Sequence, residues 1–266
     1  MALTSAQLDR YIEGQSPVHA LDARVKLLLT LACVLALALL PPGSWAALLA
    51  CAALIWWAVL RSRVGLRTIL GRAFVALPFA LVAVTLVFAR PGAPLFSLGL
   101  GPLRLTATDA GLVAFLSVVL KSWLSVQAAL LLTATTHFTA VLYALRALRL
   151  PEVLVATLSF AYRYLFVMVD EAQRLLRARE SRSAELPGRR GGGRLAWRAS
   201  VVGRMAGTLF LRAYERSERI YVAMLSRGYS GELRALGARP LTSAEQGLLI
   251  VGAALLAAIV YLAYVL

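Results

Sequence analysis

Charged residues are scarce in this chain of 266 residues, and acidic residues are the scarcest, with 13 against 28 lysines and arginines. Charged residues make up only 15% of the chain and hydrophobic residues 60%, whereas about 25% charged residues is usual for a soluble domain. This composition excludes a soluble globular enzyme. It also excludes intrinsic disorder, because so much apolar surface would not remain in water. A helical protein that crosses the membrane several times is the class that remains.

Residues that commonly build catalytic and metal sites are rare as well. The two cysteines, Cys33 and Cys51, lie in apolar runs and indicate neither a disulfide framework nor a zinc site. The two histidines are His19 and His137, whereas a metal site needs three or four convergent ligands. The chain also lacks the glycine-rich loop with a lysine that holds nucleotide phosphates. We therefore expect no catalytic residue, no metal ion and no bound ATP on this chain.

Long apolar runs are what the sequence does contain, and five of them are expected to span a bilayer as helices of roughly 20 residues. They lie at about residues 25–40, 45–60, 73–89, 110–133 and 247–266. A tight turn is predicted at 41–44, a kink at Pro78, and a Gly/Pro-rich loop with a short hairpin at 90–108. The first 24 residues lack the apolar core of a cleavable signal peptide, so the first span is expected to direct insertion.

The distribution of arginine and lysine predicts the orientation. Three segments, 1–26, 61–72 and 134–245, hold 25 of the 28 basic residues. Short loops rich in arginine and lysine stay in the cytoplasm. We therefore expect a multi-pass protein with a cytoplasmic N-terminus, in which residues 1–134 form spans one to four, 135–245 a cytoplasmic domain, and 246–266 the final span.

A sixth span over residues 153–169 is the alternative topology. This stretch is apolar apart from Arg163, and an arginine at mid-membrane costs roughly 2.5–3.5 kcal/mol on insertion scales. A span here would place the 15 basic residues of 170–245 outside the cell. The five-span topology is therefore favoured, with the apolar face of 153–169 buried in protein or at the membrane interface.

The basic segment 135–245 is predicted to form one short and two long helices. The short helix covers about 137–149, and the long helices cover about 151–181 and 195–226, with a glycine-rich break between them. On the second long helix, spacing predicts that Glu215 pairs with Arg212 and Arg219. The fold class is thus an all-α membrane protein with about five transmembrane helices and a helical cytoplasmic domain.

Both long helices end in an arginine between small residues. The two tripeptides are Ser181-Arg182-Ser183 and Ser226-Arg227-Gly228, and Ala178-Arg179-Glu180 is an alternative register for the first. The partial negative charge at a helix C-terminus favours a cation, so the arginines have one simple explanation. The other explanation is a docking tip, because small neighbours admit the tip to a groove and a guanidinium offers two parallel hydrogen bonds to a carboxylate.

Motifs along nearly the whole chain resemble those of the transmembrane T component of energy-coupling-factor (ECF) transporters, the CbiQ/EcfT group. They are the segment Ser16–Leu27, Thr108–Leu112, Leu148–Pro151 followed by Phe160–Tyr164, and the two arginine tripeptides. The resemblance implies a non-catalytic subunit. Its two long helices dock their arginine tips in grooves of two ATP-binding-cassette ATPases, and ATP-driven motion then reaches a substrate-binding S component.

The N-terminal segment and the tripeptide pair are most similar to cobalt-type members of that group. The resemblance therefore implies ATP and Mg²⁺ on a CbiO-like ATPase dimer, a cobalt ion as cargo on a CbiM-like S component, and a small auxiliary membrane subunit like CbiN, all in a bacterial inner membrane. Nickel, biotin and shared vitamin transporters are alternatives.

Two further alternatives come from other classes of protein. A stand-alone membrane carrier would need polar residues in several spans, and four of the five spans have almost none. A nucleic-acid partner is disfavoured because glutamates alternate with the arginines of 174–239, whereas contact with the lipid bilayer is expected. Lys121, inside the fourth span, is a functional candidate by its position, with packing or headgroup contact as the other explanation.

Overall fold

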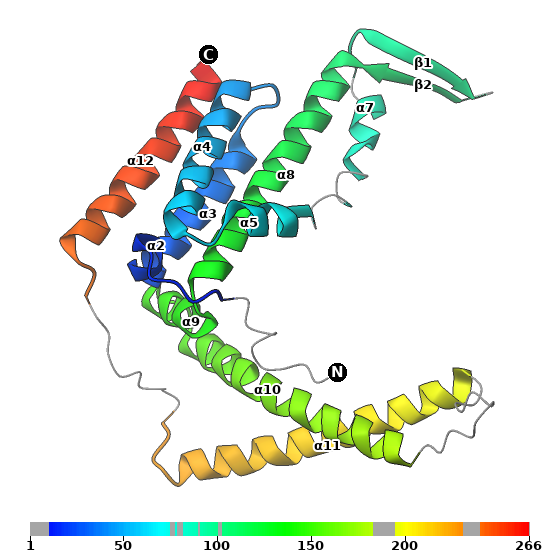
Figure 1. Ribbon diagram of the computed structural model, residues 1–266, viewed down its shortest axis with the longest axis vertical. Coiled ribbons are helices and arrows are strands. Elements are labelled where there is room, and N and C mark those ends of the chain that lie inside the picture. The colour runs from blue at the N-terminus through cyan, green and yellow to red at the C-terminus, as the bar shows by residue number, and fades with distance from the viewer. Residues whose placement is uncertain are drawn as a thin grey trace. The chain divides into compact units, whose positions relative to one another are not determined.

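The computed structural model describes residues 11–74, 78, 82–89, 91–100, 103–182, 195–230 and 240–265 (Figure 1). Contacts divide the chain into two compact units. We call Asp9–Ala144 with Arg239–Leu266 the bundle unit, and Leu145–Ala238 with Met1–Leu8 the helix-pair unit. The assignment of units to membrane and cytoplasm, with boundaries at 134/135 and 245/246, stays a prediction.

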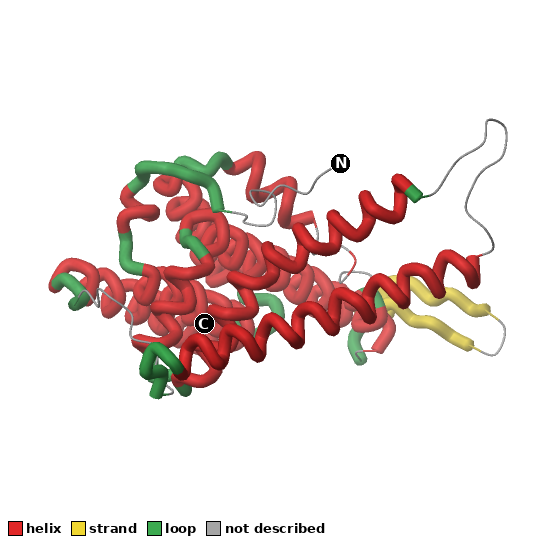
Figure 2. Tube along the Cα trace, turned by 90° about the horizontal axis from the view of Figure 1, so that it is seen from below, coloured by secondary structure: helices red, strands yellow, loops and turns green. Residues whose placement is uncertain are grey.

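The bundle unit is helical, with one antiparallel hairpin among its described residues, drawn in yellow in Figure 2. Its helices α3, α4, α8 and α12 lie side by side (Figure 1). The hairpin confirms the one predicted within 90–108. The elements are α2 (Pro17–Ala20), α3 (Ala23–Leu39), α4 (Trp45–Ser62), α5 (Leu66–Ala73), α7 (Thr85–Ala89), β1 (Pro94–Leu100), β2 (Leu103–Thr108), α8 (Asp109–Thr135), most of α9 (Phe138–Ala147) and α12 (Ser243–Val265).

Side-chain caps define where two of the long helices begin. The Asp22 carboxylate accepts a hydrogen bond from the Arg24 N–H at 2.8 Å, and the Thr108 hydroxyl accepts one from the Gly111 N–H at 3.1 Å. Each cap accepts a hydrogen bond from a backbone N–H group of the first helical turn, which has no partner within the helix itself. Gly111 also allows α7 to approach α8 closely, because a Cβ atom there would lie 2.5 Å from the Val87 carbonyl oxygen.

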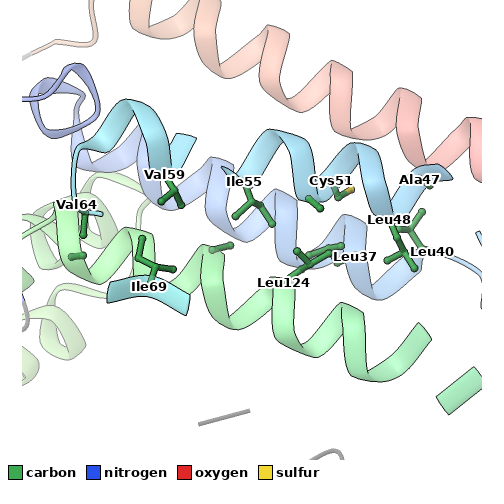
Figure 3. Packing of buried hydrophobic residues seen from close by; sticks show 13 residues of the cluster. Leu37, Leu40, Ala47, Leu48, Cys51, Ile55, Val59, Val64, Ile69 and Leu124 are labelled. Atoms are coloured by element: carbon green, nitrogen blue, oxygen red, sulfur yellow. The ribbon is translucent and has the colours of Figure 1, made fainter. Parts of the chain in front are cut away.

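A buried apolar cluster holds α3, α4, α5 and α8 together (Figure 3). Leu37 and Cys51 are fully buried at its centre, and Ile69 joins it from α5. The predicted turn at 41–44 closes one end, since the Gly43 N–H donates to the Ser117 hydroxyl at 3.0 Å. Lipid chains are as apolar as leucine, so this packing stabilises the bundle through close contact more than through exclusion of water.

The polar residues of α8 take part in packing. The Lys121 ammonium group donates to the Leu40 carbonyl oxygen, which is the C-cap position of α3. The Trp56 indole N–H donates to the Gln127 side-chain oxygen at 3.0 Å and thereby joins α4 to α8. Of the two explanations given for Lys121, the structure favours packing.

Helix α12 closes the bundle against α3 and α4. Gly252 makes the close approach possible, because a Cβ atom there would lie 2.6 Å from Cδ2 of Leu29. Near the other end of α12, the Tyr264 hydroxyl donates to the Leu39 carbonyl oxygen at 2.8 Å. Helix α12 thus contacts α3 at two positions along its length, although the two helices are far apart in sequence.

The helix-pair unit contains the end of α9 and the long helices α10 (Glu152–Ser181) and α11 (Leu195–Leu225), as predicted. The two long helices cross in Figure 1. The Glu171 carboxylate of α10 accepts a hydrogen bond from the Arg212 guanidinium of α11. The predicted pairing of Arg212 with Glu215 is therefore replaced by an ion pair between helices.

Four described helices, α4, α8, α10 and α12, are long and apolar enough to cross a membrane. Three of them coincide with the predicted spans at 45–60, 110–133 and 247–266. Helix α3, with 17 residues, matches the first predicted span. Within the predicted span 73–89, α7 covers Thr85–Ala89. Residues 75–77 and 79–81, on either side of Pro78, lie outside the described part of the chain, so the kink and the continuous third span stay predictions. Helix α10 contains the alternative span at 153–169, so the choice between five and six spans stays a prediction.

Candidate functional site

The end of α10 presents Ser181 and Arg182 to solvent. The Ser181 hydroxyl donates to the Ala178 carbonyl oxygen at 3.0 Å, and the Arg182 N–H donates to the Arg179 carbonyl oxygen at 3.1 Å. Both bonds reach back three residues, so the last turn of α10 is tight and satisfies carbonyl groups that a helix end leaves open. Ser183 lies outside the described residues.

The end of α11 is a Schellman cap. The Tyr229 N–H donates to the Met224 carbonyl oxygen and the Gly228 N–H to the Leu225 carbonyl oxygen, both at 3.0 Å. Gly228 has a φ of +78°, a left-handed conformation that glycine adopts without steric cost. The cap ends α11 sharply and leaves Ser226, Arg227 and Gly228 exposed.

The two helix ends share the same local geometry around their arginines. The Ser226 hydroxyl donates to the Ala223 carbonyl oxygen at 3.0 Å, which repeats the bond made by Ser181. The Arg227 N–H donates to the Met224 carbonyl oxygen at 3.1 Å, which repeats the bond made by Arg182. Each arginine therefore follows a serine that is bonded back to its own helix, and the backbone under both guanidinium groups is fixed in the same way.

The alternative register differs in its surroundings. Arg179 is half-buried, whereas Arg182 is exposed, and Arg179 has an interaction of its own with the rest of the chain. Within the described residues, no acidic side chain forms an ion pair with Arg182 or Arg227. An exposed guanidinium at a helix C-terminus, with no acidic partner among the described residues, is suited to bind a carboxylate of another protein.

The segment Ile12–Leu27, which contains the N-terminal motif, is hydrogen-bonded to the end of α8. The Lys26 ammonium group donates to the Thr135 carbonyl oxygen at 2.9 Å, and the Ile12 N–H donates to the Ala134 carbonyl oxygen at 3.0 Å. Nε2 of His19 lies 3.1 Å from the Ile12 carbonyl oxygen. Because a carbonyl oxygen can only accept a hydrogen bond, Nε2 carries the proton of this bond. The structural role of this segment depends on contacts between residues distant in sequence, so no local pattern predicted it.

Both histidines contact the same aromatic ring. His137 stacks on Tyr11 with ring centroids 3.5 Å apart, and His19 meets the Tyr11 ring edge-on at 5.9 Å. Within the part of the chain that the structure describes, no three His, Cys, Asp or Glu side chains gather as a metal ion would require. The histidines thus serve as packing and hydrogen-bonding groups in the bundle unit.

Comparison with known proteins gives consistent matches. Residues 14–236 match the family model CbiQ, described as cobalt transport protein. The chain is 33% identical to the energy-coupling factor transporter transmembrane protein EcfT of Thermanaerovibrio acidaminovorans, over 88% of this chain and 87% of the relative. It is 29% identical to the cobalt transport protein CbiQ of Rhodobacter capsulatus, over 79% of each chain.

A further relative is longer. The chain is 30% identical to an uncharacterized protein of Methanocaldococcus jannaschii over 65% of this chain, and the match spans 58% of that relative's length. Together with the apolar helices described above, the similarity to transporter proteins identifies a multi-pass membrane protein.

Proposed function

Because this chain belongs to the CbiQ family, we propose that it is the transmembrane T component of an ECF-type importer, and that it couples two ATPase subunits to a substrate-binding S component. The observation that carries the proposal is the matched pair of helix ends. Two long helices of one unit end in exposed arginines that follow serines with the same back-bonded geometry. Two helix ends with the same local geometry suit two equivalent grooves on an ATPase dimer.

The geometry supports a mechanical role for the helix pair. Each guanidinium binds a carboxylate in an ATPase groove by paired hydrogen bonds. The Glu171–Arg212 ion pair joins α10 to α11 away from the tips, so a displacement of one tip is passed to the other helix. When ATP binding closes the ATPases, the tips move with them and the motion reaches the S component.

In this proposal, nucleotide binding and cargo binding take place on partner subunits. In this proposal ATP and Mg²⁺ are bound by a CbiO-like ATPase dimer, and this chain is not an enzyme. The cargo is a cobalt ion, held by a CbiM-like S component with a small CbiN-like auxiliary subunit, and the name of the Rhodobacter capsulatus relative supports this cargo. Nickel, biotin and shared vitamin transport are the alternative cargoes of the same mechanism.

A stand-alone carrier is the alternative from another class. It needs polar side chains that are free to line a path, whereas Lys121 and Gln127 of α8 are bonded to α3 and α4 in the described bundle. The proposed location is a bacterial inner membrane with a cytoplasmic N-terminus, since the positive-inside rule then places the arginine tips beside cytoplasmic ATPases.

The test is reversal of charge at both tips. In an Arg182→Glu plus Arg227→Glu variant, ATPase recovered with the purified chain should fall by roughly tenfold or more, because a hydrogen bond to a charged group contributes about 1.5–3 kcal/mol. The matched control is Arg204→Glu plus Arg219→Glu, which changes the net charge equally at exposed positions of α11. Normal ATPase recovery and normal transport by the tip variant would refute the assignment of these arginines.

A further inference from the structure

A cavity of about 350 Å³ lies between α10 and α11 in the helix-pair unit. Phe160, Tyr164 and Met168 line it from α10, and Met224 and Tyr229 line it from the end of α11. The Phe160 and Tyr164 rings stack with centroids 6.5 Å apart and form one wall. The volume lies within the range of roughly 300–1,000 Å³ that is usual for small-molecule sites.

One cation faces this apolar cavity. Arg216 of α11 lines it, and the Nε–H of Arg216 is hidden from water without a hydrogen-bond partner. Among the described residues, no carboxylate forms an ion pair with Arg216, although Glu171 pairs with Arg212 one turn away. A buried donor without a partner costs about 1–3 kcal/mol, so an anionic acceptor in the cavity would stabilise this arrangement.

The surroundings indicate which anion fits. Helix α10, which forms one wall of the cavity, contains an 18-residue stretch with a mean hydropathy of 1.5. This stretch is long and apolar enough to enter a membrane. Tyrosine and arginine beside an apolar wall are typical of the membrane interface, where the ring and the aliphatic stem lie among acyl chains and the polar end reaches the headgroups. In the described part of this unit arginines outnumber acidic residues, which favours the anionic lipids of a cytoplasmic leaflet.

We propose that the cavity binds one anionic phospholipid, with an acyl chain against Phe160, Tyr164 and Met168 and the headgroup phosphate at Arg216. The lipid would fill the space between the two long helices and supply the missing acceptor. The proposal requires the helix pair to meet the bilayer, but it does not depend on ATPase docking. Its failure and the failure of the coupling role are therefore distinguishable.

Lipid titration of the full-length purified chain, followed by native mass spectrometry, tests the site. The probes are dioleoyl phosphatidylglycerol, which is anionic, and dioleoyl phosphatidylcholine, which has the same chains and no net charge. Both lipids carry the phosphate acceptor, but the choline cation cancels the charge that attracts Arg216. We therefore expect binding of the anionic lipid at about fivefold or more lower concentration, the size expected for one arginine near an anionic headgroup. Arg216→Gln should remove this preference, whereas Arg219→Gln, an exposed position on the same helix, should retain it.

A variant that fills the cavity separates the acyl chain from the headgroup. Ala213 lines the cavity, so Ala213→Phe should weaken binding of both lipids while leaving every charge in place. Equal lipid preference in Arg216→Gln and Arg219→Gln overturns the proposal. Displacement of the anionic lipid by inorganic phosphate at the same concentration also overturns it, because that result identifies a small-anion site. The two arginine variants decide the question even if Ala213→Phe does not fold.

Discussion

The bundle unit and the helix-pair unit differ in how much of their apolar surface they bury within the chain. In the bundle unit Leu37 and Cys51 are completely buried. In the helix-pair unit α11 has no buried residue over its 31 described positions, and Phe210 is 70% exposed. A helix with so much exposed apolar surface is typical of an interaction site. The comparison indicates that the bundle is stabilised by its own packing, whereas the helix pair depends on partners or lipid.

The largest expected effect comes from the bundle core. Leu37→Ala should lower the free energy of unfolding by about 2–5 kcal/mol, because it leaves a cavity in a fully buried site. Thermal unfolding of the purified chain in detergent measures this. Phe210→Ala is the matched change in the helix pair and should alter stability by no more than about 0.5 kcal/mol. Equal losses in both variants would contradict the comparison.

The next largest loss of stability is expected where Lys26 is hydrogen-bonded to the end of α8. Lys26→Met removes the donor to the Thr135 carbonyl oxygen and should cost about 1–3 kcal/mol, because a buried acceptor loses its partner. Arg67→Met removes an exposed cation from the same unit and serves as the control. The same unfolding assay checks both. A loss in the control as large as that in Lys26→Met would indicate a general effect of charge.

A smaller effect is expected at the tip of α11. Gly228→Ala forces a side chain into a left-handed backbone conformation, at a cost of about 1–2 kcal/mol. The Schellman cap should loosen, and recovery of ATPase with the chain should fall while membrane insertion continues. Gly207→Ala lies within α11, where an added Cβ meets nothing within 4 Å, and should leave recovery unchanged. Full recovery in Gly228→Ala would show that the cap is dispensable for docking.

The smallest effect is expected between the long helices. Arg212 is 51% exposed and Glu171 14%, so Glu171→Gln should cost about 0–1 kcal/mol, with the dependence on salt expected of an exposed pair. Hydrogen exchange of the α10 and α11 amides at low and high salt measures the effect. Glu215→Gln, exposed on α11, is the control. Identical exchange in the two variants would mean that the ion pair does not hold the helices together.

Local signals in the sequence predicted much of the fold. The apolar runs located α4, α8 and α12, and the turn and hairpin followed from glycine and proline. The long helices α10 and α11 were predicted because a glycine-rich break separates them. Each of these features is decided by a few neighbouring residues, so sequence alone contains the information.

Features that depend on tertiary contacts were missed or left undecided. Helical spacing paired Arg212 with Glu215, whereas the competing partner Glu171 lies on another helix, 41 residues earlier. The role of Lys121 depends on the end of α3, 81 residues earlier. At the candidate site, both arginine tripeptides were predicted, but the shared geometry of their serine and arginine hydrogen bonds was not. Backbone hydrogen bonds at a helix end depend on how the last turn tightens.

The fastening of α12 to α3 has a consequence for biosynthesis. The ribosome makes α3 and α4 before the long helices α10 and α11, and it makes Gly252 and Tyr264, which contact Leu29 and Leu39, only after them. Until then one side of the nascent bundle has no helix against it. The faces of α3 and α4 that α12 covers can therefore be buried in this chain only after α12 has been made.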